Sequence, residues 1–335
     1  MIKKDRTIET LRGGVILLVV IGHVIGSASD GGMKVSEDSF LRYFYDTFID
    51  PIQMPLFTIL AGWVYNLKPP VYDSMKSFMT KKVLRILLPM LTVGICYFLV
   101  QYFTPGTNTK SDLLDIWKLL FFPYTLFWYL YSLFVVFVIV GIIDVFNRMD
   151  TVTNWIIIFC LAVVALLLRD LFIPFESPNF LSYKGALYLL PCFVLGVGLS
   201  RFQNVFQPKW VLYLSISLLV ISVFIQQLGW FKVIDYVVHK DDVFGLFIGF
   251  TATMILIRSR LEAKWLIWFG SFAYSIYLFH AFGTAGGRII PQKLNINSNV
   301  LIFLISLTTG VILPIIAEKI LERYKITRTL FLGRS

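Results

Sequence analysis

The sequence predicts an all-α, polytopic membrane protein with about ten transmembrane helices and both termini in the cytoplasm. Of its 335 residues, 57% are hydrophobic and only 15% are charged, whereas about a quarter of the residues in a soluble domain are charged. Apolar runs of roughly 20 residues, enough to cross a bilayer as a helix, recur along the chain. The net charge of +10 is typical of basic cytoplasmic loops, so we expect the lipid bilayer as a partner and no nucleic acid.

The expected helices follow one another from the N-terminus as apolar runs bounded by polar residues. Their approximate ranges are 11–28, 43–66, 80–103, 124–146, 152–172, 185–201, 208–228, 242–258, 265–287 and 298–320. A shorter segment over 112–122 is followed by Pro123, which cannot continue a regular helix. It predicts a short helix at the membrane interface.

Charge predicts the orientation of the chain. Most lysines and arginines fall in the segments on the side of the N-terminus: KKDR at 3–6, the stretch 68–85, Arg258 with Arg260, and the tail 319–334. Cytoplasmic segments collect Lys and Arg, and an even number of spans brings the C-terminus back to that side. We see no internal repeat and no low-complexity linker, so we expect one domain over 1–335 without an appended soluble domain.

The first span, LRGGVILLVVIGHV at 11–24, carries Arg12 and His23. Their separation is close to three helical turns, so both side chains project from one face, about 16 Å apart along the axis. Arg12 alone serves equally well as a topology anchor. His23 is either satisfied by a neighbouring helix or functional, and its depth favours function because ionisable groups inside a span are costly.

Two further spans carry polar groups. In KSFMTKKVLRILLPM, Lys82 and Arg85 share a face at the cytoplasmic end of the helix. Either they anchor the span, or Arg85 contacts a ligand, since a guanidinium suits phosphate or a developing oxyanion. In LIWFGSFAYSIYLFHAFG, Tyr274, Tyr277 and His280 are spaced by three. A tyrosine stripe alone is typical of packing or of an interfacial belt, whereas the histidine at its end favours a lined cavity.

Trp128, in FWYLYS, either lines the same cavity or contacts lipid. The chain has three histidines, two of them inside spans, and no spacing typical of metal ligands. We therefore expect no metal site.

These motifs together resemble acyltransferase family 3, whose members are integral-membrane enzymes that O-acylate sugars and other acceptors. Arg12 and His23, with ten residues between them, are similar to the family's first-helix signature. Five further segments are similar to family motifs in the same order: MPLFTILAGWVY (54–65), KKVLRILLP (81–89), FWYLYSLF (127–134), LLPCFVLGVGLSR (189–201) and SFAYSIYLFH (271–280). Ala61 and Lys82 stand where the family commonly has serine and arginine.

The resemblance implies an O-acyltransferase of the EC 2.3.1 type that takes an acyl group, by family habit acetyl, from cytoplasmic acyl-CoA. The acceptor would be a hydroxyl of a cell-surface glycan or exopolysaccharide. It implies catalytic roles for His23 and Arg12, and donor binding by Arg85, Lys82 and Arg12, with no permanently bound cofactor. His23 would act as general base or accept the acyl group itself.

The same resemblance implies the plasma membrane of a bacterium and contact with polysaccharide-assembly proteins. Two other functions are compatible with the residues: a transporter that exports a glycan or its lipid-linked precursor, and a non-catalytic subunit of a polysaccharide-assembly system. Only a transferase consumes acyl-CoA, and only a non-catalytic subunit tolerates substitution of Arg12 and His23.

Overall fold

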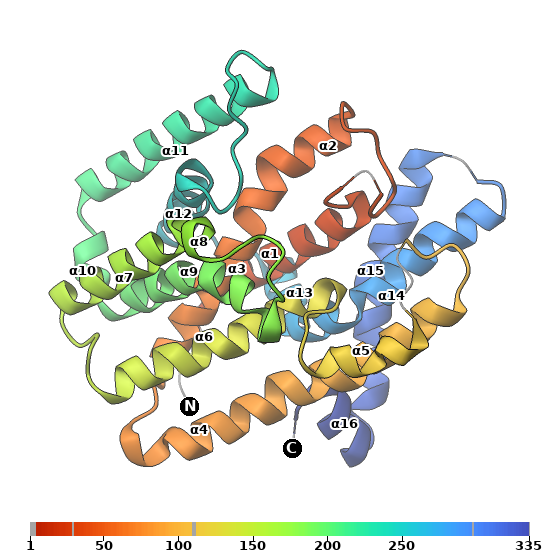
Figure 1. Ribbon diagram of the computed structural model, residues 1–335, viewed down its shortest axis with the longest axis horizontal. Coiled ribbons are helices and arrows are strands. Elements are labelled where there is room, and N and C mark those ends of the chain that lie inside the picture. Colours follow the sequence, from red (N-terminus) through yellow and green to blue (C-terminus); the bar gives the residue numbers. More distant parts are fainter. Residues whose placement is uncertain (1–4, 29, 109–111, 297, 335) are drawn as a thin grey trace. The chain divides into compact units, whose positions relative to one another are not determined.

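The computed structural model of the protein describes residues 5–28, 30–108, 112–296 and 298–334 (Figure 1). Lys3 and Lys4, part of the predicted cytoplasmic N-terminus, lie outside these residues. Every regular element in the described chain is a helix. The predicted all-α class is therefore confirmed.

The α-helices of the described residues follow one another along the chain. They are α1 (Arg6–Ile25), α2 (Phe40–Phe44), α3 (Asp50–Asn66), α4 (Met75–Lys82), α5 (Leu88–Phe103), α6 (Trp128–Val145), α7 (Val152–Leu167), α8 (Arg169–Phe172), α9 (Tyr183–Arg201), α10 (Gln203–Phe206), α11 (Lys209–Trp230), α12 (Val243–Arg258), α13 (Lys264–Ser271), α14 (Ala273–Lys293), α15 (Asn299–Leu321) and α16 (Lys325–Leu332). Two π-helical turns, Tyr45–Ile49 and Val83–Leu87, join α2 to α3 and α4 to α5. Short 3-10 helices cover Tyr72–Ser74, Leu113–Leu120, Thr125–Phe127 and Phe180–Ser182.

The protein is a multi-pass membrane protein, but the predicted count of about ten spans is not confirmed. Among the described residues, seven helical segments are long and apolar enough to cross a membrane, or eight if the bent pair α13–α14 forms one span. Two predicted spans are the 16-residue helices α7 and α12. At 1.5 Å per residue each is about 24 Å long, shorter than a hydrocarbon core of about 30 Å. The cytoplasmic placement of both termini stays a prediction.

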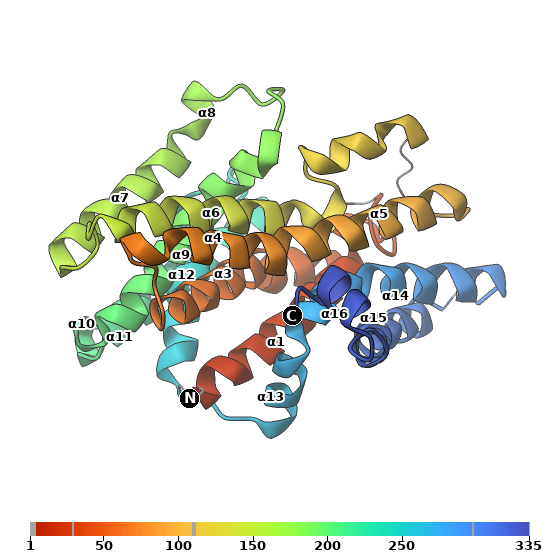
Figure 2. The same ribbon diagram turned by 90° about the horizontal axis from the view of Figure 1, so that it is seen from below.

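The ninth predicted helix, 265–287, is broken, so its continuity was wrong. α13 and α14 meet at Phe272 with a bend of 77° (Figure 2). The break follows Gly270, where a Cβ would lie 2.5 Å from the carbonyl oxygen of Glu9. A Cβ on Gly13 would likewise collide with the carbonyl oxygen of Leu266. These two glycines let α13 pack directly on the backbone of α1.

The short helix predicted over 112–122 is present as the 3-10 helix Leu113–Leu120. Asp112 caps it, because its carboxylate accepts a hydrogen bond of 3.1 Å from the amide of Leu114. Its location at the membrane interface stays a prediction.

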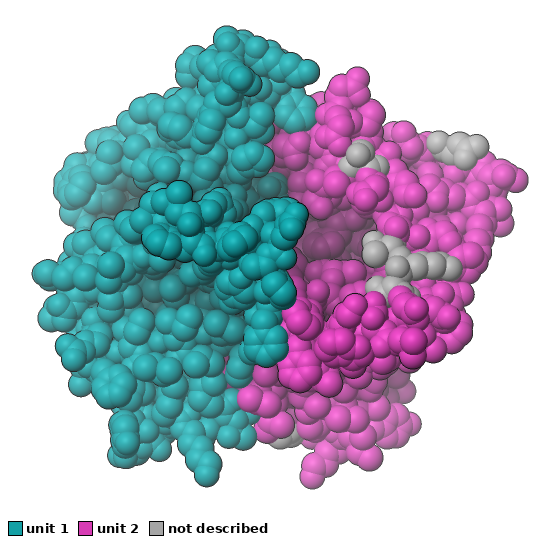
Figure 3. All heavy atoms as spheres, viewed as in Figure 1, with its two compact units in different colours: residues 1–8, 50–80, 131–262 teal, residues 9–49, 81–130, 263–335 magenta. Residues whose placement is uncertain are grey.

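The chain divides into two compact units, coloured separately in Figure 3, and each is assembled from three stretches of sequence. Unit 1 comprises residues 1–8, 50–80 and 131–262, and unit 2 comprises residues 9–49, 81–130 and 263–335. All eight predicted site residues belong to unit 2. The single domain expected over 1–335 stays a prediction.

In unit 1, α3 packs along α9, α11 packs along α12, and α12 also contacts α3. Gly62 and Gly196 stand at the crossing of α3 and α9, where added Cβ atoms would collide with the carbonyl oxygens of Phe193 and Ile59. Small residues at such a crossing allow two helix backbones to touch. The core of unit 1 is therefore built on close backbone contact.

In unit 2, α14 packs along α15. A Cβ on Gly283 would collide with the carbonyl oxygen of Thr309, and the Thr309 hydroxyl donates to the carbonyl of Gly283 at 2.8 Å. A Cβ on Gly310 of α15 would meet Thr284 of α14 and Val20 of α1 within 3 Å. This three-helix contact holds the C-terminal part of α1, which carries His23, against the middle of α14.

Candidate active site

Two histidines that are 257 positions apart in the sequence lie side by side in unit 2. His23 is near the end of α1 and His280 is in the first half of α14. Their ring centroids are 4.6 Å apart, and the ring planes meet at 78°, edge to face. His280 is fully buried, and His23 is half-buried.

Hydrogen bonds to the backbone determine which ring nitrogen is available. Nδ1 of His23 lies 2.9 Å from the carbonyl oxygen of Val19, and Nδ1 of His280 lies 3.0 and 2.8 Å from the carbonyls of Ile276 and Tyr277. A carbonyl oxygen only accepts, so Nδ1 carries the hydrogen in both rings. The basic lone pair of each neutral imidazole is therefore on Nε2, which in His280 is buried with no hydrogen-bond partner among the described residues.

A cavity of about 150 Å³ opens beside His23 within unit 2. A water molecule occupies roughly 30 Å³ in the liquid. The cavity is therefore large enough to admit a small polar group of a substrate. The polar residues that line it come from four α-helices, one 3-10 helix and one loop: His23, Tyr97, Gln101, Thr107, Asn108, Thr125, Thr284, Arg288 and Ser306. His23 is the histidine that lines this space, and an imidazole is suited to taking up and releasing a proton.

Arg288 is the cation of this cavity, and the sequence analysis missed it. Its side chain is 7% exposed, and Nη2 donates to the carbonyl of Gly106 at 3.2 Å. No carboxylate among the described residues forms an ion pair with it. His280, Thr284 and Arg288 follow one another at intervals of four and so share one face of α14. The signal was present, since an arginine interrupts the apolar sequence GTAGGRII, but the predicted span ended at residue 287.

The family of the protein follows from a match to a known protein-family model. The family model of the acyltransferase domain that defines acyltransferase family 3 matches residues 5–319. The chain belongs to acyltransferase family 3. No curated protein and no solved structure matches the chain.

In this membrane acyltransferase, the two tyrosines of the predicted stripe on α14, Tyr274 and Tyr277, form hydrogen bonds to neighbouring segments of the protein. The Tyr277 hydroxyl donates to the carbonyl of Leu126, and its ring lies 6.1 Å from the ring of His280. The Tyr274 hydroxyl donates to the carbonyl of Arg85 at 2.6 Å. Neither tyrosine is among the described residues that line the cavity beside His23, so their contact with an acceptor stays a prediction.

Two of the three predicted donor residues, Lys82 and Arg85, lie at the junction of α4 and α5. Lys82 ends α4, and Arg85 is exposed on the π-helical turn Val83–Leu87. π-helical turns inserted into α-helices occur frequently at functional sites. The bond from Tyr274 ties this turn to the start of α14. Trp128 is half-buried at the start of α6, where its ring lies 6.2 Å from that of Tyr129.

Arg12 is half-buried and forms an ion pair with Glu9, one turn earlier in α1, at 2.9 Å. It is absent from the described residues that line the cavity at His23. The separation of about 16 Å along the helix means that Arg12 and His23 cannot contact the same atom of a substrate. The roles of both residues in the acyltransferase stay predictions.

Arg42 is a second arginine that the sequence analysis missed, because the predicted span began at residue 43. It is 1% exposed, and its Nη1 donates to the carbonyl of Gly26 at 2.6 Å, just beyond the end of α1. A cation at a helix C-terminus stabilises the negative end of the helix dipole. Arg42 therefore stabilises the end of α1 that carries His23.

Proposed function

We propose that the protein transfers an acyl group, most simply acetyl, from cytoplasmic acyl-CoA to a hydroxyl of a cell-surface or secreted glycan. The observation that carries this proposal is His23, with Nδ1 bonded to a carbonyl, its ring against His280, and its side chain in the wall of a small polar cavity. This arrangement suits a general base or a nucleophile of an acyltransferase.

In the direct route, Nε2 of His23 removes the proton from the acceptor hydroxyl as its oxygen attacks the thioester carbonyl. The new C–O bond forms, the C–S bond breaks, and the thiolate of CoA takes the proton from the imidazolium. His280 is a positioning residue in this route, because its ring packs edge to face on that of His23.

In the two-step route, Nε2 attacks the thioester carbonyl itself. A C–N bond forms, the C–S bond breaks, and CoA leaves as the thiolate, so the acyl-imidazolium keeps its Nδ1 hydrogen. The acceptor oxygen then attacks the acyl carbon as the C–N bond breaks, its proton passes to the thiolate of CoA, and the neutral ring is released. The bond from Nδ1 to Val19 supports both routes equally, because it holds the ring in the tautomer that leaves Nε2 unprotonated.

Arg288 and the polar wall of the cavity are proposed to hold the acceptor. A buried guanidinium that lacks a carboxylate partner is favourable only when an anion or several oxygen atoms complete its hydrogen bonds. Hydroxyl, carboxylate or phosphate oxygens of a glycan meet that need. The size of the cavity also favours chemistry on one functional group over passage of a polymer, which argues against the transporter alternative.

Arg85, Lys82 and Arg12 are proposed to bind the donor, because its phosphates suit cationic side chains. The bacterial plasma membrane and contact with polysaccharide-assembly proteins remain part of the proposal. They follow from the class of acceptor.

The proposal is tested with the purified full-length protein in lipid nanodiscs and acetyl-CoA. Free CoA, measured with a thiol reagent, is expected to appear when extracts of the host's surface glycan are added. Mass spectrometry of the glycan from cells with and without the gene should show the acetyl group only when the gene is present. A protein that binds glycan but never consumes acetyl-CoA would overturn the proposal and favour a transporter.

A further inference from the structure

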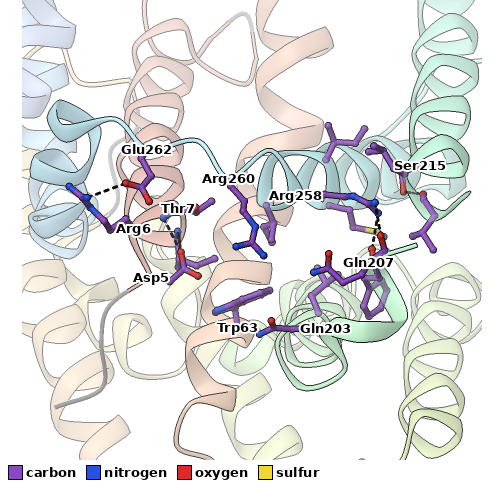
Figure 4. Close-up of a pocket in the computed structure, with 18 residues that line it drawn as sticks. Asp5, Arg6, Thr7, Trp63, Gln203, Gln207, Ser215, Arg258, Arg260 and Glu262 are labelled. Atoms are coloured by element: carbon purple, nitrogen blue, oxygen red, sulfur yellow. Dashed lines mark hydrogen bonds and ion pairs between the residues drawn. The ribbon is translucent and has the colours of Figure 1, made fainter. Parts of the chain in front are cut away.

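A second cavity, larger and of different chemistry, lies within unit 1. It has a volume of about 620 Å³, in the range of sites for small molecules. Three arginines line it, Arg6, Arg258 and Arg260, together with Asp5 and Glu262 (Figure 4). The predicted orientation puts these charged residues on the cytoplasmic side.

Both acidic residues of this cavity have partners of their own. The carboxylate of Asp5 accepts from the amides of Thr7 and Ile8, at 2.9 and 3.2 Å, and so caps the start of α1. Glu262 pairs with Arg6 at 3.3 Å. Among the described residues, neither acid forms an ion pair with Arg258 or Arg260.

Arg258 is held rigidly, but its charge is not neutralised. Nη1 donates to the carbonyls of Phe206 and Pro208, at 2.9 and 2.8 Å, and Nη2 donates to the carbonyl of Gln207 at 2.6 Å. These are three neutral acceptors, and no described carboxylate forms an ion pair with Arg258. The guanidinium is thus a fixed positive charge at the wall of the cavity.

Arg260 presents the second positive charge. Figure 4 shows its side chain extending into the cavity toward Trp63, and its guanidinium has no hydrogen bond or ion pair with any described residue. Its backbone has φ of +50°, a left-handed conformation just after α12 where glycine is the usual residue. Sparsely populated backbone conformations of this kind cluster at active sites and ligand clamps.

Gln203, Gln207 and Ser215 add polar groups to the wall, and the part formed by α11 and α12 is largely apolar. Val211 and Leu212 of α11 and Met254 and Ile255 of α12 line the same cavity. The adjacent face of α11 exposes Trp210, Tyr213 and Leu214, as expected of a helix in contact with lipid chains. A ligand that suits this cavity therefore has an anionic head group, which binds the arginines, and an apolar portion, which packs on α11 and α12.

We propose that this cavity is a binding site for an anionic phospholipid, with its phosphate held by Arg258 and Arg260 and an acyl chain against α11. The fork geometry of the guanidinium suits a phosphate diester. The two apolar helices distinguish this site from one for a free anion. The proposal goes beyond acyl transfer and does not depend on it.

The test measures the melting temperature of the purified full-length protein in detergent micelles that contain increasing amounts of a single phospholipid. Phosphatidylglycerol is expected to raise the melting temperature at lower lipid fractions than zwitterionic phosphatidylcholine. In Arg260→Gln, the phosphatidylglycerol fraction needed for a half-maximal rise should increase about tenfold. Arg148→Gln is the matched control, since Arg148 is also exposed and in unit 1, and it should behave as wild type.

Arg260→Gly separates binding from folding. Glycine adopts the left-handed conformation without steric cost, so the lipid-free protein should melt at or above the wild-type temperature and yet lose the response to phosphatidylglycerol. The proposal is overturned if both lipids act alike or if the Arg260 variants keep the full response. It is equally overturned if CoA gives the Arg260-dependent shift and phosphatidylglycerol does not, because the cavity would then belong to the acyl donor.

Discussion

Two arginines, the half-buried Arg201 in unit 1 and the buried Arg288 in unit 2, differ in what surrounds them. In unit 1, Arg201 donates to both carboxylate oxygens of Asp144, at 2.9 and 3.0 Å, and to the side-chain oxygen of Asn66 at 2.8 Å. In unit 2, Arg288 donates to one backbone carbonyl at 3.2 Å and has no ion pair with a described carboxylate. The chain thus supplies the partners of Arg201 and leaves those of Arg288 incomplete.

This difference separates charges that maintain the fold from charges that are available to a ligand. The bidentate pair of Arg201 and Asp144 connects α9 to the end of α6 and is complete without any other molecule. His23, His280 and Arg288 are ionisable groups inside largely apolar helices, where they cost free energy. We therefore expect substitutions at Asp144 to reduce stability, and substitutions at His23, His280 or Arg288 to reduce activity.

The largest effect is expected for His23→Ala. Removing the base or nucleophile should lower the rate of acyl transfer by about 1000-fold, while the melting temperature stays close to that of wild type. The measurement is the acetyl content of the surface glycan, by mass spectrometry, in cells that express the variant. His239→Ala is the matched control, because His239 is exposed in a loop and its loss should leave the acetyl content unchanged. Equal acetylation by both variants would remove His23 from the mechanism.

The next largest effect concerns unit 1. Asp144→Asn removes the bidentate counter-charge of the half-buried Arg201 guanidinium and leaves only the longer contact to Asp150, so it should lower the free energy of unfolding by about 3 kcal/mol. Thermal unfolding of the purified protein measures it. Asp150→Asn is the control: Asp150 is 3.7 Å from Arg201 but 57% exposed, so its loss should cost much less. If Asp144→Asn melted like wild type and lost only activity, the division between the two units would be wrong.

Arg288→Gln is expected to raise KM for the acceptor about 30-fold, the effect of losing one charge-assisted hydrogen bond in a buried site. KM for acetyl-CoA should not change. Steady-state kinetics with each substrate varied in turn measures both constants, and Arg148→Gln serves as the control. A rise confined to KM for acetyl-CoA would assign Arg288 to the donor instead.

The smallest effect is expected for His280→Ala, with kcat about tenfold lower and both KM values unchanged, because the ring of His23 loses its packing partner. His280→Phe keeps an aromatic edge against His23 and should recover part of kcat. If Phe and Ala reduced kcat equally, His280 would act through its nitrogen atoms and not by positioning.

The sequence predicted the helical class, which is confirmed, and a role for His23, which stays a prediction, because apolar run length and a histidine inside such a run are local signals. It could not predict the contact with His280, which depends on how α1, α14 and α15 pack at Gly310. The break at Phe272 was missed for a similar reason, since Gly270 is needed for close approach to α1. Arg42 and Arg288 were missed because they lie next to the boundaries of predicted spans, where arginines are usually interpreted as anchors.

The most direct test of the central claim is chemical rescue of purified His23→Ala protein. Transfer of radiolabelled acetyl from acetyl-CoA to the glycan is measured with and without added imidazole. We predict almost no transfer without imidazole and at least a tenfold increase with it, because the cavity beside residue 23 admits a small polar molecule. Transfer by His23→Ala at the wild-type rate in the absence of imidazole would contradict the account.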